Sequence, residues 1–287
     1  MENLNIKIIV CVHKPDFYDS DLIYIPLHVG KSISNYNMNI QVDNIGDNIS
    51  ERNRSYCELT GLYWAWKNLN LKNDVDYIGL CHYRRYFNFR GSKHFIKSLS
   101  KEQYLRQRKK NMIGPKHLKN CDIILPKPIT YPYNLFLDYS FRHVSDDMRI
   151  VRDVIHLLTP EYDDAFDKIM FANNNLSCCN MFICNWNIFD EYCRWLFEIL
   201  AALEKRIDIR HYNAVQSRIF GYIGERLLNV FVEHHKLRKK YYPIVMIDEL
   251  DVNRSVFKYY CRKLKNNAAF FFSKEWSWLE KIIKSGK

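Results

Sequence analysis

Four short apolar runs recur along the chain, and longer stretches with helical periodicity follow them. The runs occupy residues 6–12, 76–81, 121–128 and 176–185, and the helical stretches occupy residues 51–69, 147–170, 188–207 and 214–235. Runs that are apolar on both faces are typical of strands in a buried parallel sheet. This order predicts an α/β fold with a Rossmann-type, mostly parallel central sheet flanked by helices. Such sheets bind ligands at the carboxyl ends of their strands.

Two further local predictions follow from the pattern. Ser50 is the expected N-cap of one helix that covers residues 51–69, because a serine side chain can accept a hydrogen bond from a free N–H of the first turn. Residues 95–119 form a basic, polar insert that we expect to be helical and exposed, with its charges facing solvent.

Size and cysteine content narrow the class of protein. The chain has 287 residues, of which 47% are hydrophobic, so it can bury a substantial core in one large domain or two modest ones. Its first residues lack the features of a signal peptide, and no apolar run is long enough to span a bilayer, which predicts a cytoplasmic protein. The nine cysteines are scattered without metal-ligand spacing, so we expect reduced thiols and no zinc site.

Positive charge is concentrated at the end of the chain. The net charge is +11, and residues 251–287 hold nine Lys or Arg against three Asp or Glu, which gives +6. Aromatic and aliphatic residues alternate with these charges. We therefore divide the chain into a domain over 1–250 and a basic, aromatic, helical tail over 251–287. The tail is suited to an anionic membrane surface, although a helix packed on the domain with a basic end is an equal alternative.

Arginines follow the second apolar run. His82, Arg84 and Arg85 stand where this strand should end. Arginine can grip phosphate oxygens with its planar fork, so the pair could neutralise a nucleoside diphosphate, with a hydrogen bond added by His82. The simpler interpretation is a pair of surface ion pairs.

A turn precedes the first predicted helix. Its residues, together with two from the helix that follows, are candidate ligand-binding residues: Gly46, Asp47, Asn48, Ser50, Asn53 and Glu58. A helix N-terminus there would place free N–H groups beside a phosphate, and Asp47 or Asn48 could reach a sugar hydroxyl. The alternative is an ordinary turn and helix cap.

Carboxylates supply a third candidate group. Asp146 and Asp147 follow the loop residue His143, and Glu225 precedes Arg226 at what looks like the start of a helical turn. Most carboxylates are solvated or paired. Held in a cleft, however, Glu225 could deprotonate a sugar hydroxyl as a general base.

Six stretches together resemble a bacterial family of glycosyltransferases that is defined by an uncharacterised domain and encoded in capsule, exopolysaccharide and O-antigen gene clusters. The resemblance covers residues 5 to 235 approximately. It is carried by IYIPLHVGKSIS, GDNISERNRSYCELTGLYWAWKN, YIGLCHYRRYF, DIILPKP, CCNMFICNWNIFDEYCRWLFEIL and FGYIGERLLNVFV. It implies a GT-A-like fold and the transfer of a hexose, galactose in its pyranose or furanose form, from a UDP-sugar to a lipid-linked or oligosaccharide acceptor.

The resemblance also implies roles for individual residues. His13 and Lys14 would lie near the nucleotide, the candidate residues between positions 46 and 58 on the donor side, Asn180 and Met181 near the acceptor and transferred sugar, and Glu225 at the position of the base. His143 and Asp146, from the acidic stretch, are further candidates for the acceptor side. GT-A enzymes usually carry an Asp-x-Asp metal motif where this chain has Arg84 and Arg85. This departure predicts a transferase that needs no cofactor, with arginines in place of Mn²⁺ or Mg²⁺.

Three alternatives stay open at this point. Asp146 and Asp147 could hold Mn²⁺ or Mg²⁺ in a metal-dependent transferase of another UDP-sugar. The protein could stay in the cytoplasm or bind peripherally at the inner face of the membrane. The basic residues could also belong to a nucleic-acid-binding module, but they are split among a strand end, an insert and a tail without a recognisable motif, so we expect no nucleic acid.

Overall fold

A computed structural model describes residues 4–69, 75–90, 94–248 and 254–273. Its strands are β1 (Ile6–Val12), β2 (Tyr24–His28), β3 (Gln41–Val42), β4 (Tyr77–His82), β5 (Arg85–Phe87), β6 (His94–Leu99), β7 (Ile123–Pro126), β8 (Ile129–Thr130), β9 (Asn175–Leu176), β10 (Phe182–Asn185), β11 (Lys239–Tyr242), β12 (Ile244–Ile247) and β13 (Arg254–Ser255). Its α-helices are α1 (Asn53–Tyr56), α2 (Leu59–Asn68), α3 (Lys101–Arg108), α4 (Pro115–Leu118), α5 (Leu135–Ser140), α6 (Ser145–Leu158), α7 (Asp163–Met170), α8 (Trp186–Glu204), α9 (Ile219–His234) and α10 (Val256–Ser273).

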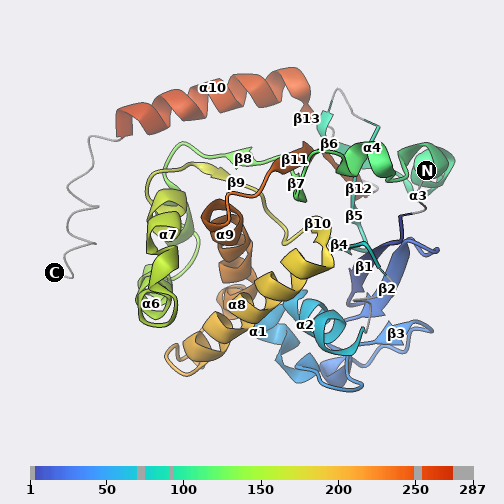
Figure 1. Cartoon of the computed structure of the whole chain (residues 1–287), viewed down its shortest axis with the longest axis horizontal. Coiled ribbons are helices and arrows are strands. Elements are labelled where there is room, and N and C mark those ends of the chain that lie inside the picture. The colour runs from blue at the N-terminus through green and yellow to red at the C-terminus, as the bar shows by residue number, and fades with distance from the viewer. Residues whose placement is uncertain (1–3, 70–74, 91–93, 249–253, 274–287) are drawn as a thin grey trace.

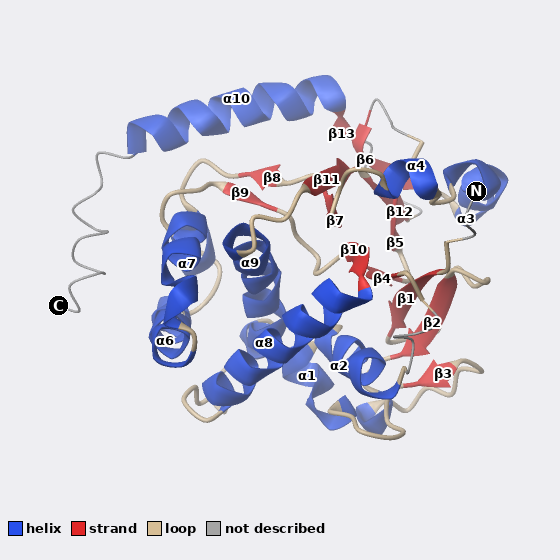
Figure 2. Cartoon of the chain, in the orientation of Figure 1, coloured by secondary structure: helices blue, strands red, loops and turns tan. Residues whose placement is uncertain are grey.

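The central sheet runs in the order β3-β2-β1-β4-β10-β7-β11. Strands β3, β2, β1 and β4 are parallel, as are β7 and β11, and β10 is antiparallel to both of its neighbours. Beyond the β4–β5 turn the sheet continues through β5, β12, β6 and β13. The predicted α/β class with a mostly parallel central sheet flanked by helices is confirmed (Figures 1 and 2).

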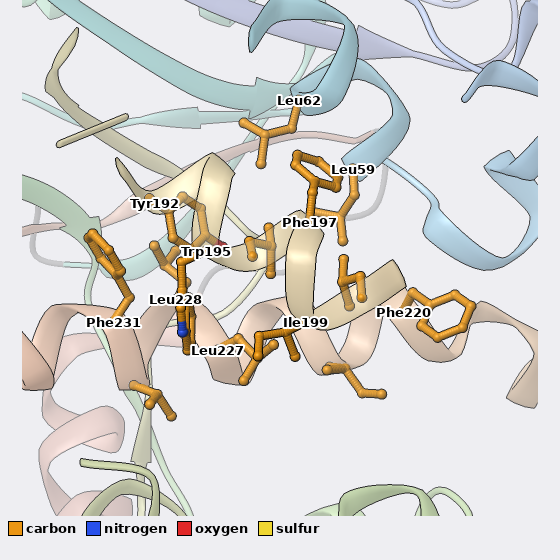
Figure 3. Close-up of a cluster of buried hydrophobic side chains, with 14 of the residues drawn as sticks. Leu59, Leu62, Tyr192, Trp195, Phe197, Ile199, Phe220, Leu227, Leu228 and Phe231 are labelled. Atoms are coloured by element: carbon orange, nitrogen blue, oxygen red, sulfur yellow. The ribbon is translucent and has the colours of Figure 1, made fainter. Parts of the chain in front are cut away.

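The alternation of side chains along β1 explains why both faces of the sheet are covered. Ile9 and Cys11 belong to a core shared with the long helices, whereas Ile8, Val10 and Val12 belong to a core shared with β5, β12 and α3. The first core includes side chains of α8 and α9 gathered near Leu59 and Leu62 (Figure 3). Helix α8 begins where the Asn185 side chain accepts a hydrogen bond from the Ile188 N–H, at 3.0 Å.

The predicted single helix over residues 51–69 is wrong. The segment forms a 3-10 turn at Ser50–Arg52, then α1, a break at Cys57 and finally α2, and Ser50 does not cap a helix. Cys57 has a φ of 53°, and the Asn53 amide donates hydrogen bonds to the Cys57 carbonyl and the Thr60 hydroxyl. These side-chain bonds offer the backbone an alternative to a continuous helix, which local propensity does not reveal.

Two other boundaries also differ from prediction. The insert 95–119 is only partly helical, because its first residues form β6, which pairs with β12 from far along the chain. The run 176–185 is a strand only at its ends, and residues 177–181 form a loop between β9 and β10.

The predicted tail is helical over α10, whereas the domain boundary at residue 250 and the tail after residue 273 lie outside the described residues.

Gly79 allows the close approach of β4 and β10. A Cβ placed there would lie 2.6 Å from the Phe182 carbonyl oxygen and 2.7 Å from the Ile183 side chain. We expect Gly79→Ala to lower the free energy of unfolding by about 1–3 kcal/mol, measured by urea denaturation, because the strands must separate. Gly114→Ala is the matched control, since a Cβ at Gly114 meets no atom within 4 Å. Equal midpoints for the two variants would contradict this explanation.

Candidate active site

A cavity of about 500 Å³ lies beyond the carboxyl ends of β1 and β4. Its walls come from the residues that follow these strands, from the α1–α2 segment, from the loop before β10 and from the start of α9. It is lined by Cys11, His13, Val29, Asn53, Arg54, Cys57, Glu58, His82, Tyr83, Arg84, Arg85, Cys179, Ala214, Arg218, Glu225, Met246, Ile247 and Asp248. The cavity therefore lies at the edge of the sheet where the sequence predicts ligand binding.

The β4–β5 turn brings two arginines to this cavity. His82 pairs with Arg85 across the turn, so Arg84 and Arg85 leave the sheet where the main strands end. The Arg84 guanidinium lies 5.3 Å from the centre of the Tyr83 ring, and its Nε is 4.0 Å from an Asp16 carboxylate oxygen. Within the described residues, Arg85 has no carboxylate partner within 4.0 Å. Its charge is thus available to an anionic ligand.

Besides Arg54 of α1, the cavity is lined by a further arginine, Arg218. It stands immediately before α9, and its Nε donates a hydrogen bond to the Cys57 Sγ, at 3.3 Å. Four guanidinium groups from three segments of the chain therefore line one pocket. Such a cluster favours a ligand with several negative charges, and phosphate oxygens match the guanidinium fork.

His13 lies on the same side of the cavity. Its ring packs edge-on against Tyr83, with centroids 5.3 Å apart. Burial lowers the pKa of His13, and the nearby positive charge of Lys14 lowers it further. A neutral imidazole is therefore expected at pH 7, so His13 would contribute a hydrogen bond to a ligand and not a charge.

The loop before β10 has an unusual backbone at the cavity wall. Cys179 and Asn180 have φ angles of 72° and 49°, in the left-handed region that residues other than glycine rarely adopt. The Cys179 N–H donates to Glu225 Oε1 at 2.9 Å, and its carbonyl accepts from His82 Nε2 at 2.6 Å. The Asn180 amide donates to Glu58 Oε1 at 2.7 Å. The side chains of Glu58, His82 and Glu225, from three segments, thus hold the strained turn. A strained backbone persists only where surrounding contacts hold it in this way.

Glu225 has the properties of a candidate base. Its side chain is 22% exposed, and burial raises its pKa, an effect opposed by Arg226 and strengthened by the charge of Glu58. Its Oε2 is 3.9 Å from Arg226 Nη1. Glu225 lies in the second turn of α9, which begins at Ile219, and not at the start of the helix. The residue nearest the helix start is instead Arg218.

The structure brings together seven of the sequence-predicted site residues. His13, Asn53, Glu58, His82, Arg84, Arg85 and Glu225 line the cavity. Asn180 is 1% exposed and contacts Glu58 from behind the wall, and Met181 is fully buried in the core. Lys14 does not line the cavity, although its charge acts on His13.

Gly46, Asp47, Asn48 and Ser50 are not brought to the cavity. Asp47 accepts a hydrogen bond from the Tyr63 hydroxyl, and its backbone contacts Asn68. Ser50 is fully buried, and its hydroxyl donates to Asp43 at 2.5 Å. The polar groups of the turn thus form hydrogen bonds with α2 and with the buried Asp43 carboxylate. These bonds explain why the turn is polar, and no ligand is needed to account for it.

Ser50→Ala tests this placement. The substitution leaves one oxygen of the buried Asp43 with one hydrogen bond fewer, since the Lys31 N–H still donates to it. We expect the free energy of unfolding to fall by about 1–3 kcal/mol in urea denaturation. Nucleotide affinity, measured by calorimetry on the folded variant, should not change. A loss of nucleotide affinity with an unchanged free energy of unfolding would contradict this placement and would support Ser50 as a ligand-binding residue.

His143, Asp146 and Asp147 also lie away from the cavity walls. Asp146 is exposed and pairs with Arg149 at 3.1 Å, whereas Asp147 is buried and accepts a hydrogen bond from Tyr212 at 2.5 Å. His143 stacks on Tyr222, and burial lowers its pKa to about 4. The described residues contain no group of three His, Cys, Asp or Glu side chains arranged to hold a metal ion.

Sequence reasoning missed several cavity residues. Arg218 is the most important of them. The one sequence feature that could have indicated it is its position two helical turns before Glu225 on the same predicted helix. For Cys57 and Cys179 the sequence predicts only reduced thiols, and Asp248 follows β12, a strand that the sequence does not predict. None of these residues stands in a motif that alone indicates a ligand.

Comparison with known proteins adds two findings. Residues 7–236 match a family model described as a domain of unknown function, DUF4422. The solved apo structure of WbbM, a bifunctional glycosyltransferase, superposes with a TM-score of 0.74 at 31% sequence identity, covering 85% of this chain and 46% of that one. The chain thus spans about half the length of WbbM. A search of curated proteins finds no match. The structural match confirms the predicted GT-A-like fold.

Proposed function

Because the chain belongs to the DUF4422 family and is similar in structure to a glycosyltransferase, we propose that it catalyses glycosyl transfer from a nucleotide sugar to a saccharide acceptor. The observation that carries the proposal is the cavity itself. It is lined by four arginines and by three carboxylates: Arg54, Arg84, Arg85, Arg218, Glu58, Glu225 and Asp248. A transferase needs both groups, cations for the leaving diphosphate and a base for the acceptor hydroxyl.

The donor we propose is a UDP-hexose. UDP carries its negative charge on two adjacent phosphates, which suits a cluster of guanidinium groups. The family resemblance favours galactose, as pyranose or furanose, and an acceptor that is a lipid-linked saccharide or an oligosaccharide of capsule, exopolysaccharide or O-antigen synthesis. These finer assignments rest on the resemblance, whereas the cavity supports the coarser class of an anionic sugar donor.

The proposed reaction breaks the bond between the anomeric carbon and the β-phosphate oxygen, and UDP leaves with the electron pair. Arg84, Arg85 and Arg218 bind the diphosphate more strongly as its negative charge grows, which lowers the barrier and not only the substrate's dissociation constant. The acceptor hydroxyl attacks the anomeric carbon from the opposite face and loses its proton to Glu225, as in an inverting transfer.

Two of the three carboxylates that line the cavity, Glu58 and Glu225, do not suit a divalent cation of the kind that GT-A enzymes usually hold. One oxygen of Glu58 accepts a hydrogen bond from Asn180, and one oxygen of Glu225 accepts from the Cys179 N–H. These bonds direct both groups toward the strained turn. We therefore assign charge neutralisation to the arginines and derive no step through Mn²⁺ or Mg²⁺.

A UDP-release assay with a panel of UDP-sugars tests the proposal. The protein is assayed with EDTA and then with added Mn²⁺, with and without saccharide acceptors. We expect release of UDP from a UDP-hexose to continue in EDTA. A requirement for Mn²⁺ would overturn the arginine assignment but leave glycosyl transfer in place. Neither turnover nor binding of any nucleotide sugar would overturn the proposed function.

A further inference from the structure

Helix α10 presents three distinct faces over its 18 residues. One face binds the protein body, where the Tyr259 hydroxyl donates to the Pro128 carbonyl at 3.1 Å and the Asn266 amide donates to the Thr130 carbonyl at 2.6 Å. Asn267 accepts from the Asn174 amide on the same side. Figure 1 shows α10 lying along the outer side of β8 and β9.

The second face is apolar and points to solvent. Phe257, Tyr260, Leu264 and Phe271 recur at helical spacing and form one stripe, and the next residue, Phe272, is also exposed. The exposed fractions are 77% for Phe257, 70% for Leu264, 69% for Phe271 and 74% for Phe272. Exposed apolar stripes of this length are uncommon on soluble proteins and mark interaction surfaces.

The third face is basic and lies next to the apolar stripe. Lys258, Arg262 and Lys265 recur at helical spacing and are exposed. No Asp or Glu occurs anywhere in α10. An exposed apolar face beside a purely basic one is the pattern of a helix that lies in the plane of a membrane interface, with its apolar side chains among the lipid chains and its cations at the headgroups.

We propose that α10 docks this protein on an anionic lipid surface through its apolar stripe and basic face. Charge complementarity selects this occupant. A second copy of the chain would bring the same cations opposite one another, which is unfavourable. No helix in the described part of the chain is long and apolar enough to cross a membrane. The repetition of Lys258, Arg262 and Lys265 keeps one side of the first part of α10, over residues 258–265, at the headgroups.

Vesicle sedimentation of the full chain tests the docking surface. We expect binding to phosphatidylcholine vesicles that contain phosphatidylglycerol, weaker binding at high salt and little binding to phosphatidylcholine alone. Phe257→Ser/Leu264→Ser/Phe271→Ser and Lys258→Glu/Arg262→Glu/Lys265→Glu should each lower the partition coefficient about tenfold or more, since both kinds of contact contribute.

The matched control is Leu105→Ser/Leu157→Ser, which removes two exposed leucines from α3 and α6 and should bind as the unaltered chain does. Circular dichroism confirms that each variant is folded. Equal binding by all variants, or no binding of the unaltered chain to anionic vesicles, would overturn the proposal. So would a dimer in light scattering that the apolar substitutions dissociate without any vesicle binding. UDP release by the same variants is measured separately, so a failure of the proposed activity does not affect this test.

Discussion

Arg85→Ala is expected to lower kcat/KM for the UDP-sugar by about 10²–10³-fold, measured by UDP release in EDTA. Arg85 lines the cavity without a carboxylate partner among the described residues, so its charge is available to the diphosphate. The loss should appear mainly in kcat, because the charge on the leaving group grows as the glycosidic bond breaks. Arg85→Lys should recover part of the activity, since it keeps the charge but loses the planar fork.

Two comparisons make this result specific. Arg149→Ala removes an exposed arginine that pairs with Asp146 outside the cavity and should leave turnover unchanged. The double variant Arg84→Ala/Arg85→Ala should abolish the residual turnover that Arg85→Ala retains, because Arg84 lines the same cavity. If the double variant turns over UDP-sugar as the unaltered chain does, the arginines are structural and the diphosphate must be bound elsewhere.

The strands and long helices could be predicted from the sequence because their signals are local. Strand β1 and helices α8 and α9 follow directly from apolar length and helical spacing. Residues 82–85, with the sequence HYRR, could likewise be placed at a strand end, and in the structure they line the cavity. In each case the residues that decide the outcome lie within about twenty positions of one another.

Features set by distant contacts could not be predicted in this way. The break at Cys57 depends on the Asn53 side chain, and β6 depends on a strand that begins at Ile244. The polar turn before α1 resembles a ligand-binding loop, but its Ser50 hydroxyl is bound by the buried Asp43. Polar composition shows that a segment makes hydrogen bonds, and only the fold shows with what.

Glu225→Gln is expected to lower kcat by about 10²–10⁴-fold, the contribution typical of a general base. Glutamine keeps an oxygen that can accept the Cys179 N–H, so the strained turn should survive and the folded state should unfold at nearly the same temperature. Glu225→Ala removes both the base and the acceptor and should also loosen the turn. Comparing the two variants by UDP release and thermal melting separates catalysis from positioning.

The pH profile supplies an independent test of the same residue. Burial raises the pKa of Glu225 above the ordinary glutamate value of 4.5, and the negative charge of Glu58 raises it further. A base must be ionised to act, so kcat/KM should fall as the pH drops through this raised pKa. Glu58→Gln removes the neighbouring charge and should shift the acidic limb to lower pH. An acidic limb that stays in place in Glu58→Gln and persists in Glu225→Gln would show that Glu225 only holds the turn at Cys179.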